Sequence, residues 1–349
     1  MIVGPIQILR EQIMGLKLTI CTPLLCILFS VVLVSCASTA QLNITSKLNP
    51  PILNSTTTSS IPQKSRILLV NTNRSIERYR IAEASFTTSL KHSLAANTID
   101  SIDLKQNPNP IDTLQDLLNA QHYDAVYTIG AKALGSIDYI DPDMPVIFSS
   151  VLNWRRFDAQ ENYYGIASEV ASEAQFAWFK YFFPKIKKVG VLYSYNNQML
   201  VQSAQQSARK LNIKLITKEV RSEEQLRDAS QTLLSQVDAL WLISDPTVLT
   251  STQNTKSLFT LADKQKIPIF TYNKFFVAMG ATLSITADLP TTGRQAALMM
   301  MNVLKHSTTE KTVQFPAGSS ITLNVGKADT YKLDLNDDAL DSVDVIVWE

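Results

Sequence analysis

The sequence has few of the side chains that perform most enzyme and metal chemistry. Its 349 residues include three cysteines, of which Cys21 and Cys26 lie in an apolar N-terminal run and Cys36 lies at the end of that run. The chain beyond residue 36 therefore has no thiol for a disulfide, a metal site or a nucleophile. The three histidines, at positions 92, 122 and 306, are far apart, so a histidine-rich metal site is not expected either.

The sequence also lacks an excess of charge of either sign. Lysine and arginine number 32 against 31 aspartates and glutamates, which gives a net charge of +1. Such a chain offers no basic field for a nucleic acid, so a nucleic-acid partner is not expected. No Gly-Lys-Ser/Thr follows a glycine-rich turn, which argues against a nucleotide loop, and we expect no cofactor.

The N-terminal segment has the pattern of a secretory signal. Lys17 precedes an apolar run at residues 18–34 that is short for a spanning helix, which needs about 20 apolar residues. The letters LVSC at 33–36 resemble the lipobox of bacterial lipoproteins. That resemblance implies removal of residues 1–35 and acylation of Cys36, for example by palmitate, which would hold the mature chain at a membrane. An uncleaved anchor helix is the alternative.

Residues 36–65 are rich in Ser, Thr, Asn and Pro without an apolar period, which predicts a flexible tether. From residue 66 onward, short apolar runs typical of buried strands alternate with helical patterns, which predicts βαβ units and parallel sheets. The expected strands are 67–70, 99–104, 125–129, 146–148, 188–193, 214–220, 239–243 and 268–272. The expected helices include 76–94, 113–120, 199–211, 223–234 and 250–266.

The order of elements is similar in the two halves, and so are the letters YDAV at 123–126 and VDAL at 237–240. We therefore predict an α/β fold of two Rossmann-like lobes, although any α/β strand pair could show such an echo. The expected boundaries are 66–163 plus part of 286–325 for the first lobe and 164–285 for the second. Residues 326–349 are expected to form a C-terminal extension with an added strand.

Polar side chains follow most of the predicted strands. Ligands of open parallel sheets bind beyond the carboxyl ends of the strands, so these side chains are candidates for a ligand site. The candidates are Asn71, Thr128, Gly130, Ala131, Ser149, Ser150, Tyr195, Asn196, Ser244, Asp245, Tyr272 and Asn273. Strand ends can also be polar merely because they reach solvent.

Four of these positions carry a more specific expectation. At Gly130 and Ala131 a helix start offers backbone N–H groups and its dipole to a carboxylate. Asp245 is expected to accept from a ligand ammonium, and aromatic rings such as Tyr272 could stack on a ring of the ligand.

The chain from 66 to 330 resembles the substrate-binding proteins of ABC importers, in the group of tryptophan/tyrosine-type lipoproteins. The matching segments are YDAV at 123–126 with Gly130, MPVIFSSV at 144–151, YGI at 164–166, KVGVLYS at 188–194, VDAL at 237–240, IPIF at 267–270 and GRQAA at 293–297. The resemblance implies a type I periplasmic binding fold with two lobes, three crossings and a hinge that closes on a ligand. Where many members have Asp-Pro, this chain has Asn-Trp-Arg-Arg at 153–156, which indicates a different pocket wall.

The resemblance implies a lipid-anchored solute-binding protein on the periplasmic face of a membrane, delivering a small polar or zwitterionic solute to an ABC permease by hinge closure. The alternative is a ligand-sensing lipoprotein that regulates a membrane partner such as a sensor kinase. An enzyme is disfavoured by the scarce Cys and His and by the missing Gly-X-Ser-X-Gly elbow.

Overall fold

The computed structural model describes residues 64–93, 98–157, 161–305 and 313–348. The expected signal peptide, Cys36 and nearly all of the tether lie outside these ranges. Within them, no helix has the length and hydropathy needed to cross a bilayer.

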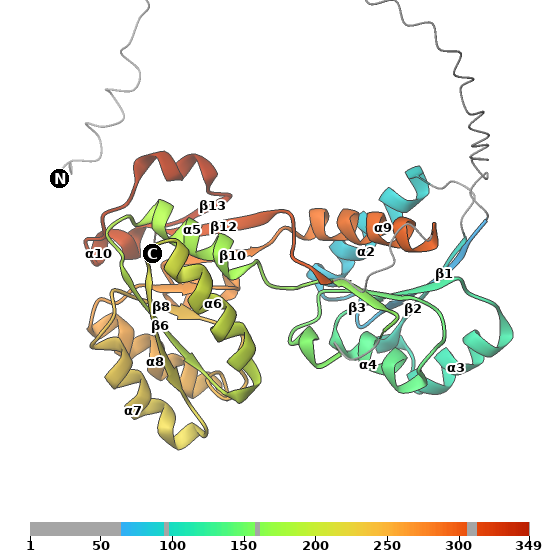
Figure 1. The fold of residues 1–349 in the computed structure, drawn as a ribbon, viewed down its shortest axis with the longest axis horizontal. Helices are drawn as coiled ribbons and strands as arrows, with labels where there is room; N and C mark the ends of the chain where they lie inside the picture. Colours follow the sequence, from blue (N-terminus) through green and yellow to red (C-terminus); the bar gives the residue numbers. More distant parts are fainter. Residues whose placement is uncertain (1–63, 94–97, 158–160, 306–312, 349) are drawn as a thin grey trace, which may run out of the picture. The chain divides into compact units, whose positions relative to one another are not determined.

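The first sheet has six parallel strands in the order β11-β5-β4-β3-β1-β2. Figure 1 labels β1, β2 and β3 of this sheet, with α3 and α4 beside them. The strands are β1 (Arg66–Asn71), β2 (Thr98–Asp103), β3 (Ala125–Ile129), β4 (Val146–Ser149), β5 (Tyr163–Ile166) and β11 (Val313–Gln314). Its helices are α2 (Glu77–Ser93), α3 (Pro110–Ala120), α4 (Ala131–Ile140) and α9 (Leu289–Leu304), with 3-10 turns at η1 (Leu104–Gln106) and η2 (Trp154–Phe157). Alternate residues of β1 enter two cores, so Ile67 packs with α2 and α9 and Leu68 packs with α3 and α4.

The second sheet has seven strands in the order β13-β12-β10-β9-β8-β6-β7, parallel except where β10 meets β12. The strands are β6 (Lys188–Tyr193), β7 (Lys214–Glu219), β8 (Ala239–Leu242), β9 (Ile269–Thr271), β10 (Leu283–Ala287), β12 (Ser319–Asn324) and β13 (Val345–Val347). The helices are α5 (Ser172–Phe182), α6 (Gln198–Lys210), α7 (Glu223–Leu234), α8 (Thr252–Lys264) and α10 (Val325–Thr330), with 3-10 turns η3 (Tyr195–Asn197), η4 (Lys274–Met279) and η5 (Asp337–Ser342). One core forms with α5 and α6 and another with α7 and α8.

The chain crosses between the two sheets after β5, after β10 and between β11 and β12. Because β5 pairs with β4, the first lobe extends to Ile166 and passes the expected boundary at 163. Residues 326–349 are not a separate extension in the described part, because α10 packs on the second lobe and β13 pairs with β12.

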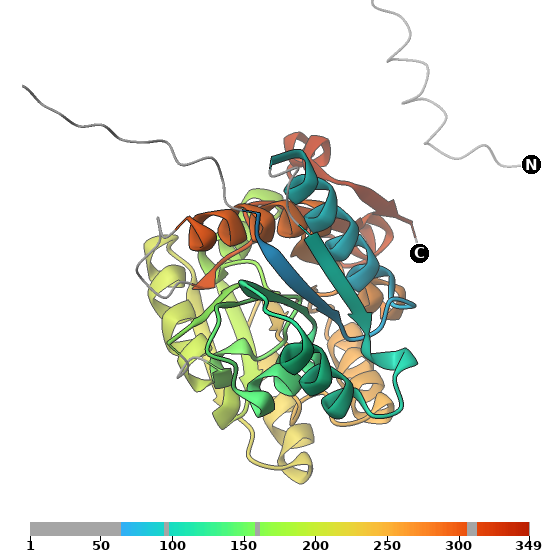
Figure 2. The same cartoon turned by 90° about the vertical axis from the view of Figure 1, so that its right-hand side faces the viewer.

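Helix α9 returns to the first lobe and packs directly on α2 (Figure 2). The close approach depends on Gly293, where an added Cβ would lie 2.6 Å from the carbonyl oxygen of Ala82 and 2.7 Å from Cβ of Ser85. This contact joins two segments far apart in the sequence and completes one face of the first sheet.

Candidate binding site

A pocket of about 290 Å³ lies where the two lobes and their crossing segments meet. The first lobe contributes residues of α2, the loop after β4 and the start of α9, and the second lobe contributes residues that follow β9. The lining residues are Arg78, Ile81, Ser150, Leu152, Ala167, Ser168, Tyr272, Asn273, Lys274, Thr286, Ala287, Asp288, Leu289, Pro290, Thr292 and Ser320. The sequence placed three of them, Ser150, Tyr272 and Asn273, among its candidates.

Ser150 is the most unusual residue of the pocket. It follows β4 with a left-handed backbone (φ 58°), which a non-glycine residue adopts only at a cost. The residue is 8% exposed, and its Oγ has no hydrogen-bond partner among the described residues. A buried hydroxyl without a partner costs about 1–3 kcal/mol, so this group is suited to receive a ligand atom.

Tyr272 and Asn273 line the pocket from the second lobe. Burial raises the pKa of the Tyr272 hydroxyl, against the opposing effects of a hydrogen bond with Ser244 and the charge of Arg78. The phenol therefore stays neutral and can donate or accept. Asn273 Oδ1 accepts from the Phe275 backbone N–H at 3.0 Å, so its carbonyl caps η4 while its position borders the pocket.

Charges of both signs border the pocket. Arg78 lies in the first turn of α2 and Lys274 begins η4, while Asp288 caps α9 by accepting from the Thr291 N–H at 2.9 Å. The strand-end rule could not find Arg78, because it lies within a helix, or Asp288, because it lies in a crossing segment. A pocket with both signs of charge can hold a zwitterion.

A second pocket of about 40 Å³ adjoins the first and shares Leu152, Ser168 and Tyr272 with it. Ser244, a fourth candidate from the sequence, lines this smaller pocket. The two pockets together form the candidate site. Among the described residues, no group of three His, Cys, Asp or Glu side chains could hold a metal ion.

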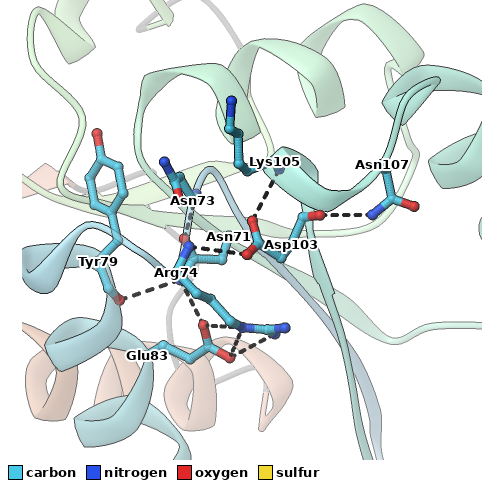
Figure 3. Close-up of polar contacts among 8 residues, drawn as sticks. All are labelled: Asn71, Asn73, Arg74, Tyr79, Glu83, Asp103, Lys105 and Asn107. Atoms are coloured by element: carbon cyan, nitrogen blue, oxygen red, sulfur yellow. Dashed lines mark hydrogen bonds and ion pairs between the residues drawn. The ribbon is translucent and has the colours of Figure 1, made fainter.

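Asn71 does not line the site, contrary to expectation. Its amide donates to Glu83 Oε2 at 2.6 Å, and its Oδ1 accepts from the Asn73 N–H at 2.9 Å (Figure 3). The Nε of Arg74 lies 3.0 and 2.9 Å from the two oxygens of the same Glu83 carboxylate. The polar end of β1 is therefore used to hold its own loop against α2.

The carboxyl end of β3 is also filled by protein groups, so the anion site expected at Gly130 and Ala131 does not fit the structure. Gly130 has φ 91°, and a Cβ there would lie 2.7 Å from Thr72 Oγ1. That oxygen accepts from the Ala133 N–H at 3.0 Å and so occupies the start of α4. Thr128 and Ser149 are fully buried, and the Ser149 hydroxyl lies 2.6 Å from the hydroxyl of Tyr127.

Asp245 has a structural role that conflicts with the expected contact to a ligand ammonium. The side chain is 2% exposed, and its oxygens accept five hydrogen bonds from the second lobe. The donors are the Ser194 N–H and hydroxyl, the Asn197 amide and the backbone N–H groups of Thr247 and Val248. Asp245 therefore joins the loops after β6 and β8.

Tyr195 and Asn196 are exposed residues of η3 that line neither pocket, and the Tyr195 side chain is 79% exposed. The neighbouring Asn197 is buried and lines the smaller pocket. Within this 3-10 turn Tyr195 and Asn196 are exposed and Asn197 is buried, a difference that three consecutive polar residues in the sequence do not reveal.

Comparisons with known proteins identify the family. A model of the ABC transporter substrate binding protein family matches residues 89–345. This chain belongs to that family. The description of the family is that of a substrate-binding protein.

One curated relative is a tyrosine-binding protein of Clostridioides difficile, 22% identical over 258 residues that cover 70% of each chain. A ligand-free, open substrate-binding protein with adhesive properties from Clostridium difficile has a TM-score of 0.64 at 16% identity, covering 81% of this chain and 99% of that one. An ABC domain from Streptococcus pneumonia in complex with L-Trp has a TM-score of 0.55 at 19% identity, covering 82% of this chain and 100% of that one. These likenesses and the sheet orders confirm the predicted fold of type I periplasmic binding proteins.

Proposed function

We propose that this chain is an extracytoplasmic substrate-binding lipoprotein that holds a small zwitterionic solute of the amino-acid type between its lobes. The relatives whose names mention tyrosine and L-Trp support this solute class. Membership in this family supports delivery of the solute to an ABC permease, and the sequence pattern at 33–36 supports lipidation at Cys36. A solute that contacts both lobes stabilises the closed arrangement of the hinge and so presents both lobes to the permease.

The observation that carries the proposal is Ser150. A left-handed non-glycine backbone and a buried hydroxyl without a partner each cost of the order of 1–3 kcal/mol. Both occur at one residue, and that residue lines the pocket between the lobes. A ligand atom that pairs with the Ser150 hydroxyl removes the second cost, and this hydrogen bond therefore contributes favourably to the free energy of solute binding.

The charges around the pocket support a zwitterion. Arg78 and Lys274 approach from different lobes and can attract a solute carboxylate, while Asp288 can attract an ammonium group. Tyr272 offers a neutral hydroxyl and an aromatic face beside them. The remaining candidate contacts are the Asn273 position and, in the smaller pocket, Ser244.

The test is calorimetry of the mature protein with L-tyrosine, L-tryptophan, other amino acids, nucleosides and sugars. We expect an amino acid to bind, and we expect Ser150→Ala to lower its affinity by about tenfold, the loss of one hydrogen bond, without lowering the thermal midpoint.

Ser284→Ala is the matched control, because Ser284 also has a buried hydroxyl without a partner and lines neither pocket. It should bind like the wild type. Binding of a sugar or nucleoside in place of every amino acid, or equal affinities of Ser150→Ala and wild type, would contradict the proposal.

A further inference from the structure

The wall between the two pockets carries an ion pair that the proposed function does not use. Arg155 lies in η2 of the first lobe, and its Nη1 lies 2.7 Å from Glu169 Oε1 in the segment that crosses to the second lobe. The indole N–H of Trp154 donates to the same oxygen at 3.1 Å, and the Arg155 guanidinium lies 4.3 Å from the centre of the Trp154 ring. Trp154 and Arg155 belong to the segment, 153–156, in which the sequence departs from the family pattern.

The cluster is fixed to the hinge side of the site. The Ser168 hydroxyl donates to the Val151 carbonyl at 2.8 Å and lies 3.3 Å from Glu169 Oε2. The loop that begins with Ser150 is thereby tied to the first crossing segment. The ion pair therefore keeps a defined position relative to the candidate site.

Arg155 and Glu169 are the charged residues of the smaller pocket. The other lining residues are neutral, and those from the second lobe include Gln175, Asn197, Trp241 and Ser244. The side chains of Arg155 and Glu169 are 29% and 17% exposed, so solvent screens their charges less than those of a surface pair. Each charge is nonetheless neutralised by the other at this short separation.

We propose that Glu169 masks the charge of Arg155 and thereby sets the specificity of the smaller pocket, so that it admits the neutral end of a solute and rejects an acidic one. An acidic group entering past Tyr272 meets a guanidinium already paired with a carboxylate, and it adds a second negative charge beside Glu169. A neutral hydroxyl or amide meets no such repulsion and can pair with Ser244, whereas the Asn197 amide nitrogen already donates to the Ser244 carbonyl and to Asp245. The inference rests on the proposed function, because it assigns the end of the solute that lies beyond the pocket with Ser150.

Glu169→Gln tests the mask with little change of shape. The amide oxygen can still accept from Arg155 and Trp154, while the negative charge is gone and the guanidinium is free to attract an anion. Calorimetry would use two matched pairs of probes, L-glutamine with L-glutamate and L-tyrosine with 4-carboxy-L-phenylalanine. We expect Glu169→Gln to raise the affinity of an acidic probe relative to its neutral partner by about tenfold or more.

Two further variants exclude a merely structural effect. The double variant Arg155→Met with Glu169→Gln should lose the gained preference for the acidic probe, because the unmasked charge is removed. Glu173→Gln is the matched control, since Glu173 pairs with Lys210 at 3.1 Å on the surface of the second lobe and lines neither pocket. Glu173→Gln should leave the ratio of acidic-probe to neutral-probe affinity unchanged for both pairs of probes.

The outcomes separate this inference from the proposed function. The inference alone is overturned if the wild type binds a neutral probe and Glu169→Gln leaves the ratio of acidic-probe to neutral-probe affinity unchanged. If neither the wild type nor Glu169→Gln binds any of the four probes, the inference falls together with an amino-acid solute. The inference would also be overturned if Glu169→Gln and the double variant gained the same relative affinity for the acidic probe. The gain would then not depend on the charge of Arg155.

Discussion

At the scale of single residues, Asp245 shows how a buried carboxylate can hold two loops together. Its five donors belong to the loops after β6 and β8, and they leave the carboxylate 2% exposed. Hydrogen bonds to a charged group are the stronger ones, and donors that lose it remain buried and unpaired.

We therefore expect Asp245→Asn to destabilise the protein by about 2–4 kcal/mol, because an amide nitrogen would face donors that need an acceptor. Urea unfolding followed by circular dichroism measures the change. Asp116→Asn, at an exposed position of α3, is the control and should stay within about 0.5 kcal/mol of wild type. Wild-type stability of Asp245→Asn would mean that the carboxylate is not needed by these loops.

Residues at strand ends could be found from the sequence, but the direction in which their side chains point could not. The rule that ligands bind beyond strand ends led to Ser150, Tyr272 and Asn273, which line the larger pocket. The same rule led to Asn71 and Asp245, whose polar atoms are satisfied by their own loops. A polar residue in the sequence indicates that its side chain needs a hydrogen-bond partner. Whether that partner is a protein group or a ligand depends on how the loops fold.

At the scale of elements, the contact between α2 and α9 depends on one glycine. An added Cβ at Gly293 would lie 2.6 Å from a backbone oxygen of α2, which cannot move aside as a flexible side chain could. Gly135 of α4 provides the opposite case, because no atom beyond its chain neighbours and the backbone of its own helix lies within 4 Å of the position where its Cβ would be.

We expect Gly293→Ala to lower the free energy of unfolding by about 1–3 kcal/mol, the usual cost of overpacking. Gly135→Ala should be neutral or stabilising by up to about 1 kcal/mol, since alanine favours a helix interior. Denaturant unfolding of both variants provides the comparison. A Gly293→Ala variant as stable as Gly135→Ala would show that the helices can separate at no cost.

Long apolar elements were predictable, and short ones were less so. The expected strand at 67–70 lies within β1 (Arg66–Asn71), and the expected helix at 76–94 nearly coincides with α2 (Glu77–Ser93). The expected boundary between residues 163 and 164 falls inside β5 (Tyr163–Ile166), because a strand of four residues containing Gly165 has little apolar pattern. The two residues of β11 have no apolar pattern. These short strands depend on neighbours in the sheet, which the local sequence does not contain.

At the scale of the whole molecule, neither lobe is a continuous piece of chain. The first lobe includes α9 and β11, which come after β6 to β10 of the second lobe in the chain. The elements β12, α10 and β13 then belong to the second lobe again. The crossing after β10 and the crossing before β12 lie side by side. The antiparallel pairing of β10 with β12 ends at Ala287 and Ser319, and the Asp288 N–H then donates to the Gly318 carbonyl. The candidate pocket lies against these crossings, so a solute in it contacts segments that belong to both lobes.

This arrangement predicts that a solute protects both sheets together. Ligand at a hundred times its Kd stabilises the native state by about 2.7 kcal/mol, which slows exchange through global opening by about a hundredfold. Hydrogen exchange measured by mass spectrometry should therefore show slower exchange in β1 of the first lobe and in β6 of the second. Ser150→Ala at the same solute concentration should show a smaller effect in both sheets, because its occupancy is lower. Protection confined to one sheet would mean that the solute contacts one lobe, and the pocket between the lobes would then not be where it binds.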